Sequence, residues 1–275
     1  MRRFVLLWLA LSLLVVMAAP AGAITRGGSL DGEDHPYVGL MVAQDADGGP
    51  LWRCSGSLIS PTVFVTAGHC TESPAALAEI WFDTDVESGI PANGYPVGGP
   101  DSYSGVTHTY PLYNPAAFYL YDLGLVELSD PVYIDEYAQL PDIGVVDTLK
   151  PGRKSAVVTA VGYGLQAASV NPVHPEKTVA ERIRMQAELM VVDTHGVAGI
   201  GNLGVDPPTN SMILSGDAAH GGTCFGDSGG PMLLGQSDTL VAVNSFGLNG
   251  NCAGVGGAYR IDRAEELDWI SGFLH

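Results

Sequence analysis

Basic residues are scarce in this sequence. Its 275 residues include 12 Lys and Arg against 30 Asp and Glu, which gives a formal net charge of −18 at pH 7. A chain this acidic lacks the electropositive surface that attracts a phosphate backbone. We therefore expect no nucleic-acid partner. We interpret the acidity as a solubility feature, with a preference for basic substrates as the weaker alternative.

Long apolar runs are lacking too, except at the N-terminus. Two arginines at positions 2 and 3 precede an apolar run over 4–19, and the residues of 20–23 are mostly small. This pattern is typical of a secretory signal peptide cleaved after Ala23. A membrane anchor is the alternative, but a bilayer span needs about 20 apolar residues. We expect a signal peptide over 1–23 and a secreted, extracellular protein that has no membrane contact after cleavage. The mature chain would then keep 10 basic and 30 acidic residues, which gives a formal charge of −20.

Cysteine is sparse, and long segments of helical periodicity are rare. Four cysteines, an even count in an exported chain, predict two disulfides, and none of them forms a CxxC pair that would suggest zinc. Short β-branched and apolar runs alternate with turns in a chain that contains 36 Gly and 18 Pro, which predicts an all-β fold. Loops are expected at 86–105 and 196–210, and the polar segment 135–152 could join two halves. The expected strands are 37–42, 57–59, 62–66, 123–128, 156–161, 187–192, 212–214, 232–234 and 240–245.

One clear helical pattern lies at the C-terminus. Asp262 can cap this helix, and Glu265 stands three positions on, as in a capping box. Leu267, Ile270 and Phe273 or Leu274 recur at helical spacing and form one apolar face. We predict a packing helix over 263–274.

Three short motifs carry the residue types of nucleophilic catalysis. A serine hydroxyl needs a general base, histidine can act as one near neutral pH, and a carboxylate fixes the ring tautomer and stabilises the imidazolium. Each motif alone could be structural, but together they identify Ser228 as the candidate nucleophile, His69 as the base and Asp122 as the carboxylate. The motifs are TAGHC at 66–70, YDLGLV at 121–126 and GDSGGP at 226–231.

The serine motif also fits the G-x-S-x-G pattern of α/β-hydrolases. That fold places the serine between a strand and a helix and has the chain order Ser, Asp, His. Here Pro231 and two glycines follow Ser228, and His275 is the single histidine beyond it. The order and the local sequence therefore disfavour this alternative.

With these motifs the chain resembles the trypsin/chymotrypsin family of serine proteases over nearly the whole mature sequence. The resemblance implies two six-stranded antiparallel Greek-key barrels with the active site between them, followed by a short C-terminal helix. It implies a protease domain over 24–275, with barrel 1 at about 24–140, barrel 2 at about 141–262 and the helix at 263–274. The similar segments are CSGSLIS at 54–60, VTAGHC at 65–70, SFG at 245–247, GGAY at 256–259 and Trp269-Ile270.

The resemblance also implies an activity and its residues. A serine endopeptidase would hydrolyse peptide bonds of protein or peptide substrates through an acyl-enzyme, as a monomer, with no cofactor and no metal. His69 and Asp122 would come from barrel 1 and Ser228 from barrel 2. The remaining implied assignments are an oxyanion hole formed by the N–H groups of Gly226 and Ser228, a hydrogen bond from Ser245 to Asp122, and disulfides Cys54–Cys70 and Cys224–Cys252.

Family members bury a new N-terminal amine against the Asp that precedes the catalytic serine. Here that acid is Asp227, and the candidate amine belongs to Ile24, the first residue after the predicted signal cleavage. The next residues, 25–28, depart from the usual sequence. We expect signal peptidase itself to create the active N-terminus; the alternative is cleavage elsewhere followed by trimming.

The residues that would form the primary substrate pocket are largely uncharged. By resemblance, Gly222 forms the base with Thr223 beside it, Gly247 and Gly257 form the walls, and Asn244 and Ser245 belong to the substrate-binding strand. Because no Asp stands at the base, we expect no preference for Lys or Arg. An open slot favours a large apolar or aromatic side chain, although Thr223 and Asn244 together could favour a polar one, even an acid.

Three alternatives remain open. The chain could be a non-catalytic protease homologue that acts as a binding module, although such proteins usually lose a triad residue. It could be an esterase that uses the same triad. Separately, Asp83, Asp85 and Glu87 could bind Ca²⁺, but they lack the spacing of a calcium loop, so a solvated turn is the favoured interpretation.

Overall fold

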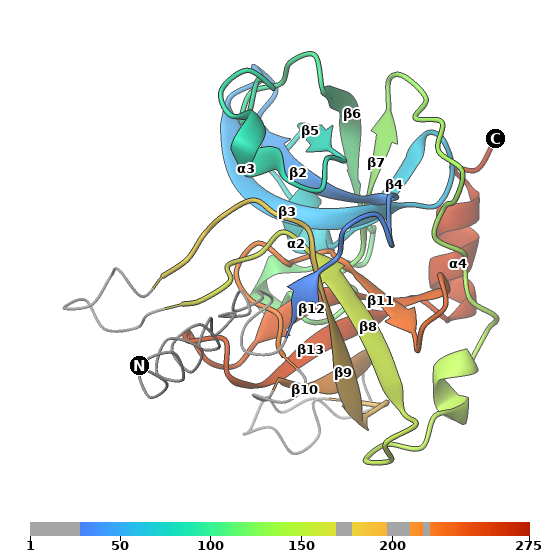
Figure 1. The fold of residues 1–275 in the computed structure, drawn as a ribbon. Helices are drawn as coiled ribbons and strands as arrows, with labels where there is room; N and C mark the ends of the chain where they lie inside the picture. Colours follow the sequence, from blue (N-terminus) through green and yellow to red (C-terminus); the bar gives the residue numbers. More distant parts are fainter. Residues whose placement is uncertain (1–27, 169–177, 197–209, 217–220) are drawn as a thin grey trace, which may run out of the picture.

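Two antiparallel β-barrels form the molecule. The computed structural model describes residues 28–168, 178–196, 210–216 and 221–275. Figure 1 shows the N-terminal barrel above the C-terminal barrel, with the last helix running alongside both. The predicted fold class, two six-stranded barrels with few helices, is confirmed.

Barrel 1 is a closed sheet in the strand order β2-β3-β4-β7-β6-β5, closed by the pairing of β2 with β5. Every residue of β2 is buried, because one face lines the barrel and the other is covered. The strands are β2 Val38–Gln44, β3 Pro50–Leu58, β4 Val63–Thr66, β5 Leu77–Trp81, β6 Ser102–Thr109 and β7 Gly124–Leu128.

Barrel 2 has the order β9-β10-β13-β12-β11-β8 and is closed by the pairing of β8 with β9, while the short strand β1 adds to β9. In β9 buried apolar residues alternate with more exposed residues, among them Gln186 and Glu188, as expected for a strand with one face toward a core. The strands are β1 Ser29–Leu30, β8 Val157–Gly162, β9 Met185–Asp193, β10 Ser211–Gly216, β11 Pro231–Leu234, β12 Leu240–Gly247 and β13 Gly254–Arg260.

Sequence patterning missed strands that are rich in glycine and serine. Strand β6 lies partly inside the loop expected at 86–105, and the glycine-rich β13 carried no apolar alternation. Both strands are held by their neighbours in the barrels, so tertiary pairing outweighs their weak β-propensity. The short helices are α2 Gly68–Thr71, α3 Val86–Gly89 and the 3₁₀ turns η1 Pro115–Ala117 and η2 Val145–Thr148.

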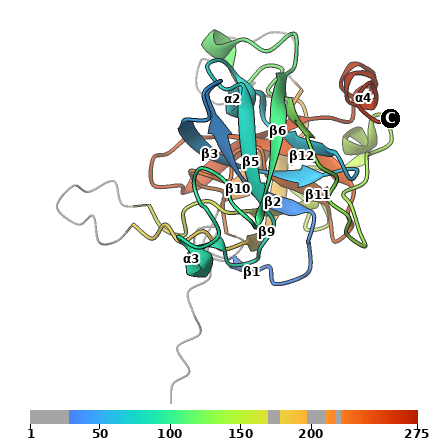
Figure 2. The same cartoon turned by 90° about the horizontal axis from the view of Figure 1, so that it is seen from above.

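The C-terminal helix α4 spans Ala264–Ser271, shorter than the predicted 263–274, and packs against barrel 1. Figure 2 shows it at the edge of the molecule, away from α3 and β1. The expected cap by Asp262 is wrong: Arg263 occupies the N-cap position without a side-chain bond. Asp262 instead accepts two hydrogen bonds from the buried Arg260 guanidinium, at 2.8 and 2.9 Å. A buried guanidinium requires a paired carboxylate, and this requirement outweighs a helix cap.

None of the helices in the described residues is long and apolar enough to cross a membrane.

A buried ion pair joins the two barrels to the N-terminal segment. The Arg184 Nε–H donates to Asp31 Oδ2 at 2.8 Å, and both side chains are almost fully buried. The same guanidinium donates to the carbonyls of Gly32 at 2.7 Å and Phe82 at 2.9 Å. Because Arg184 immediately precedes β9 and Phe82 immediately follows β5, these bonds fix the two barrels relative to each other.

We expect Arg184→Met to lower the free energy of unfolding by about 3–5 kcal/mol, because it leaves the Asp31 carboxylate buried without its cation. The matched control is Arg182→Met, which removes a partly exposed partner of Glu87 and should cost about 1 kcal/mol or less. Urea unfolding measures both variants. Equal losses would contradict the role given to Arg184.

Candidate active site

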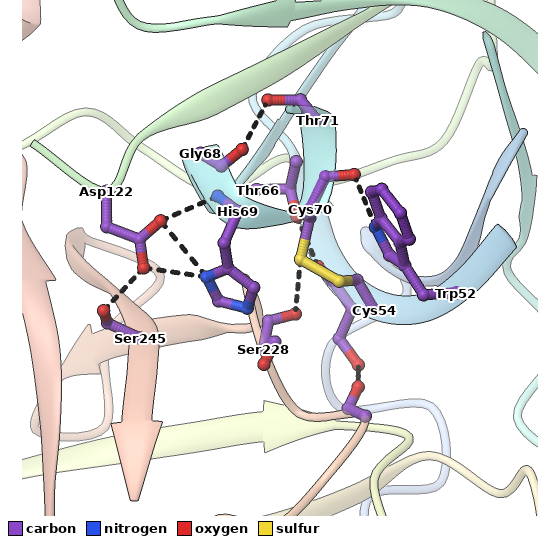
Figure 3. The surroundings of a disulfide bond; sticks show 12 residues. Trp52, Cys54, Thr66, Gly68, His69, Cys70, Thr71, Asp122, Ser228 and Ser245 are labelled. Carbon is purple, nitrogen blue, oxygen red and sulfur yellow. Dashed lines mark hydrogen bonds and ion pairs between the residues drawn. A yellow bond between two sulfur atoms is a disulfide. The ribbon is translucent and has the colours of Figure 1, made fainter. Parts of the chain in front are cut away.

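The Asp122 carboxylate is the most enclosed group of the site. Asp122 precedes β7, is 0% exposed and follows Tyr121, whose φ of 59° is uncommon for a residue other than glycine. Its Oδ1 accepts the backbone N–H of His69 at 2.9 Å, and its Oδ2 accepts the Ser245 hydroxyl at 2.5 Å. Figure 3 shows these bonds converging on one carboxylate. The expected Ser245–Asp122 hydrogen bond is thus present.

The His69 ring is oriented by the same carboxylate. Its Nδ1 lies 2.9 Å from Asp122 Oδ2 and 3.2 Å from Oδ1. A carboxylate accepts, so Nδ1 carries the proton and the lone pair of the neutral ring is on Nε2. Burial lowers the His69 pKa, but the charge and hydrogen bond of Asp122, helped by the charge of Glu72, outweigh it and the pKa is raised. The site therefore stabilises an imidazolium.

The Ser228 loop is held between the barrels. The Ser55 N–H of β3 donates to the Ser228 carbonyl at 2.8 Å, and the Gly229 N–H donates to the Asn244 carbonyl of β12 at 2.8 Å. Glycine is required at 229: φ is +77°, and a Cβ would lie 2.0 Å from Thr66 Oγ1. In Figure 3 Ser228 lies beside the His69 ring on the side away from Asp122.

Two N–H groups of this loop are left without a partner among the described residues. The N–H groups of Asp227, Gly229 and Gly230 donate to backbone carbonyls within the chain, whereas those of Gly226 and Ser228 do not. A pair of unpaired donors flanking a serine can bind a developing oxyanion. This is the arrangement that the resemblance implied for Gly226 and Ser228.

Asp227 is a buried acid whose carboxylate accepts two hydrogen bonds from described residues. It is 1% exposed, and its two oxygens accept the N–H groups of Gly164 at 2.7 Å and Cys224 at 2.8 Å. Burial raises its pKa to about 6, although these two bonds and the charge of Arg53 oppose the rise. Its expected cationic partner, Ile24, lies outside the described residues.

Both expected disulfides are present, and each secures a site segment. Cys54–Cys70 links β3 to the helix that carries His69, and Cys224–Cys252 links the start of the Ser228 loop to the segment after β12. The Cys70 sulfur also lies 3.7 Å from the Ser228 carbonyl oxygen, so this disulfide contacts both site segments.

Most of the expected pocket residues come together beside Ser228. A pocket of about 270 Å³ includes Ser228 and Thr223, together with Asn244, Ser245 and Gly247. Its inner continuation, of about 20 Å³, shares three of these residues and reaches Gly222 and Gly256.

Gly257 differs from the expectation for a pocket wall. A Cβ on Gly257 would meet the Phe246 ring at 2.1 Å, whereas one on Gly256 would point toward Thr223 Oγ1 at 3.7 Å. A bulge in β12 between Asn244 and Phe246 shifts the register, so Gly256 is the glycine that lines the pocket.

Aromatic residues that no sequence motif identified also line this pocket. Phe118 lies after η1, with its ring 6.3 Å from the His69 ring and edge-on to Phe246. Phe225 is 60% exposed at the pocket rim. Only its position three residues before Ser228 could have indicated Phe225, whereas nothing near Phe118 resembles a motif.

Two of the three acidic residues considered for Ca²⁺, Asp85 and Glu87, have other partners. The Asp85 carboxylate accepts the Ser88 N–H at the start of α3, and Glu87 pairs with Arg182. In the described part of the chain, the single group of three possible metal ligands is Cys54, His69 and Cys70, and its two sulfurs are bonded to each other.

Comparisons with known proteins agree with this geometry. The family model described as Trypsin matches residues 26–270, so the chain belongs to the trypsin family. It is 30% identical over 240 residues to a trypsin of Sarcophaga bullata, covering 86% of this chain and 82% of the relative. It is 27% identical over 256 residues to chymotrypsin-like elastase family member 3B of Homo sapiens, covering 86% and 88% of the two chains.

Solved structures support the fold alone. HL collagenase superimposes with a TM-score of 0.64 at 22% identity, over 86% of this chain and 92% of its own. A scabies mite inactivated protease paralogue superimposes with a TM-score of 0.62 at 20% identity, over 90% and 99%. The same fold thus accommodates proteins with different activities, so activity must be argued from the site.

Proposed function

We propose that the protein is a serine endopeptidase that hydrolyses peptide bonds through an acyl-enzyme. The observation that carries the proposal is the buried Asp122 carboxylate aligned on His69 Nδ1, with the Ser228 loop on the other side of the ring. Family membership supports a serine endopeptidase in general.

Each step of the reaction has a residue to perform it. Ser228 Oγ attacks the substrate carbonyl carbon while its proton passes to His69 Nε2. Asp122 stabilises the resulting imidazolium, and the N–H groups of Gly226 and Ser228 donate to the oxyanion, each contributing about 3–4 kcal/mol. The intermediate then expels the amine, which takes the proton from His69. Water, deprotonated by His69, releases the acyl group by the same steps.

A non-catalytic binding module and an esterase are the competing functions. The first is disfavoured because His69, Asp122 and Ser228 are all retained and two of them are already hydrogen-bonded. An esterase would use the same acyl chemistry, so only substrate measurements separate it from a protease.

The cellular setting and partners follow from the same features. The predicted signal peptide over 1–23 and the two disulfides favour secretion into an oxidising compartment. The acidic chain favours peptide substrates over nucleic acid as partners, and a monomer suffices because all proposed catalytic groups come from one chain. No acid is present among the described lining residues of the pocket, so cleavage after Lys or Arg is not expected.

Activation through Ile24 remains part of the proposal. The Asp227 carboxylate is buried with two N–H partners and a pKa raised to about 6, so an ammonium group would lower the cost of its charge. Pairing with the Ile24 amine would hold Asp227, and through it the Gly226 N–H, in the oxyanion geometry.

We expect Ser228→Ala to abolish labelling by a serine-directed phosphonate and to reduce casein hydrolysis by about 10⁶-fold, because the nucleophile is lost. The matched control is Ser237→Ala, at an exposed turn, which should label and hydrolyse like the wild type. Labelling without casein hydrolysis would favour an esterase. Absence of labelling in the wild-type protein would favour a binding module.

We expect one extra residue before Ile24 to reduce kcat/KM at least about tenfold, because the amine then cannot reach Asp227. N-terminal sequencing of the secreted protein should give Ile24. A chain that begins at Ile24 and carries a C-terminal extension of the same size is the control and should be fully active. Full activity with the extra N-terminal residue would exclude this mode of activation.

A further inference from the structure

An inner slot continues the pocket beside Ser228. Glycines 222, 247 and 256 line it, together with Leu214, Thr223 and Asn244, and its free volume of about 20 Å³ leaves room for a small group. The outer pocket of about 270 Å³ shares Thr223, Asn244 and Gly247 with the slot. A substrate side chain on the acyl side of the bond cleaved at Ser228 would therefore cross the outer pocket and end in the slot.

Asn244 is fixed at the junction of the two spaces. Its backbone carbonyl accepts the Gly229 N–H at 2.8 Å and its N–H donates to the Gly230 carbonyl at 2.9 Å. In the sheet Asn244 is opposite Ala258, and Gly247 is opposite Gly256, so all four share the slot side of β12 and β13. The bulge that follows Asn244 turns Phe246 to the other face, above Gly257.

The Asn244 side chain lines both spaces, and its amide forms no hydrogen bond with a described residue. Little of the residue is exposed, so the amide is reached mainly through the pocket. The half-buried Thr223 side chain also lines both spaces and has no hydrogen bond within the described part of the chain. Water or a ligand that enters the pocket can therefore supply hydrogen bonds to both side chains.

The rest of the slot restricts the chemistry of that partner. None of its described lining residues is charged, so these residues offer no counterion to a Lys, Arg or Glu side chain. An apolar side chain would displace water and leave the amide unpaired, which is also costly. An aromatic ring would likewise offer no hydrogen bond to the Asn244 amide, although the sequence favoured a large apolar residue. A carboxamide is flat, uncharged, and both donates and accepts, as the Asn244 amide does.

We propose that Asn244 determines specificity for an uncharged carboxamide side chain, and that glutamine is preferred immediately before the cleaved bond. Two methylene groups of glutamine span the outer pocket, and its amide pairs with Asn244 and Thr223 in the slot. This inference rests on the proposed endopeptidase function. It makes Asn244 a specificity residue that does not take part in bond cleavage.

The test uses the mature protein and fluorogenic peptides that differ only in the residue before the bond: Gln, Glu, Leu, Phe or Lys. We expect kcat/KM for the Gln peptide to exceed each of the others at least tenfold. Asn244→Leu, which keeps the branched shape and removes the hydrogen-bonding groups, should lower the Gln-to-Leu ratio of kcat/KM at least tenfold. Thr223→Val should lower it less, and Thr159→Val, at a buried threonine of β8 outside the pocket, is the matched control with an unchanged ratio.

Active-site titration with a small fluorophosphonate separates the possible failures. Wild-type protein that does not label would overturn the proposed function itself. Protein that labels but prefers Leu, Phe, Lys or Glu would overturn the specificity proposal alone. An unchanged Gln-to-Leu ratio of kcat/KM in an Asn244→Leu protein that labels would also overturn the specificity proposal. If the Asn244→Leu protein does not fold, an unchanged ratio in Thr223→Val overturns the proposal and a lowered ratio supports it.

Discussion

The site depends on the burial of one carboxylate, that of Asp122. Excluded from water, it would be costly to ionise without donors, and it has three: the His69 N–H, the His69 ring and the Ser245 hydroxyl. These donors come from the segment after β4 and from β12, so they join barrel 1 to barrel 2. The carboxylate therefore orients the ring and fixes the strand that forms the substrate pocket.

The Ser228 loop shows how this arrangement reaches the reacting atoms. Ser55 of barrel 1 holds it from one side and Asn244 of barrel 2 from the other. The approach is so close that residue 229 must be glycine. Since the loop is held by its carbonyls and later N–H groups, the N–H groups of Gly226 and Ser228 stay available for a substrate oxygen. The buried Arg184–Asp31 pair adds a second link between the barrels through the Phe82 carbonyl.

Sequence alone could predict the parts of this molecule that depend on local chemistry. The order of His69, Asp122 and Ser228 and most of the apolar strands were readable from residue types and spacing, although β5 was missed, and the cysteine pairs came from the family resemblance. The predictions failed where contacts between residues far apart in the sequence determine the local structure. Asp262 pairs with Arg260 and does not cap the helix, and one bulge in β12 makes Gly256, not Gly257, the glycine that lines the pocket. The glycine-rich β13 had no apolar pattern and was indicated by the resemblance alone; it forms a strand because β10 and β12 flank it. Phe118 reaches the site only through the fold, so no local pattern could indicate it.

The central claim is that Asp122 stabilises a protonated His69. The direct measurement is an NMR pH titration of the His69 ring in the inert Ser228→Ala protein, repeated after adding Asp122→Asn. We expect a pKa above the ordinary value of 6.5 with Asp122 present and a clearly lower pKa after the substitution. The same pKa in both proteins would contradict it.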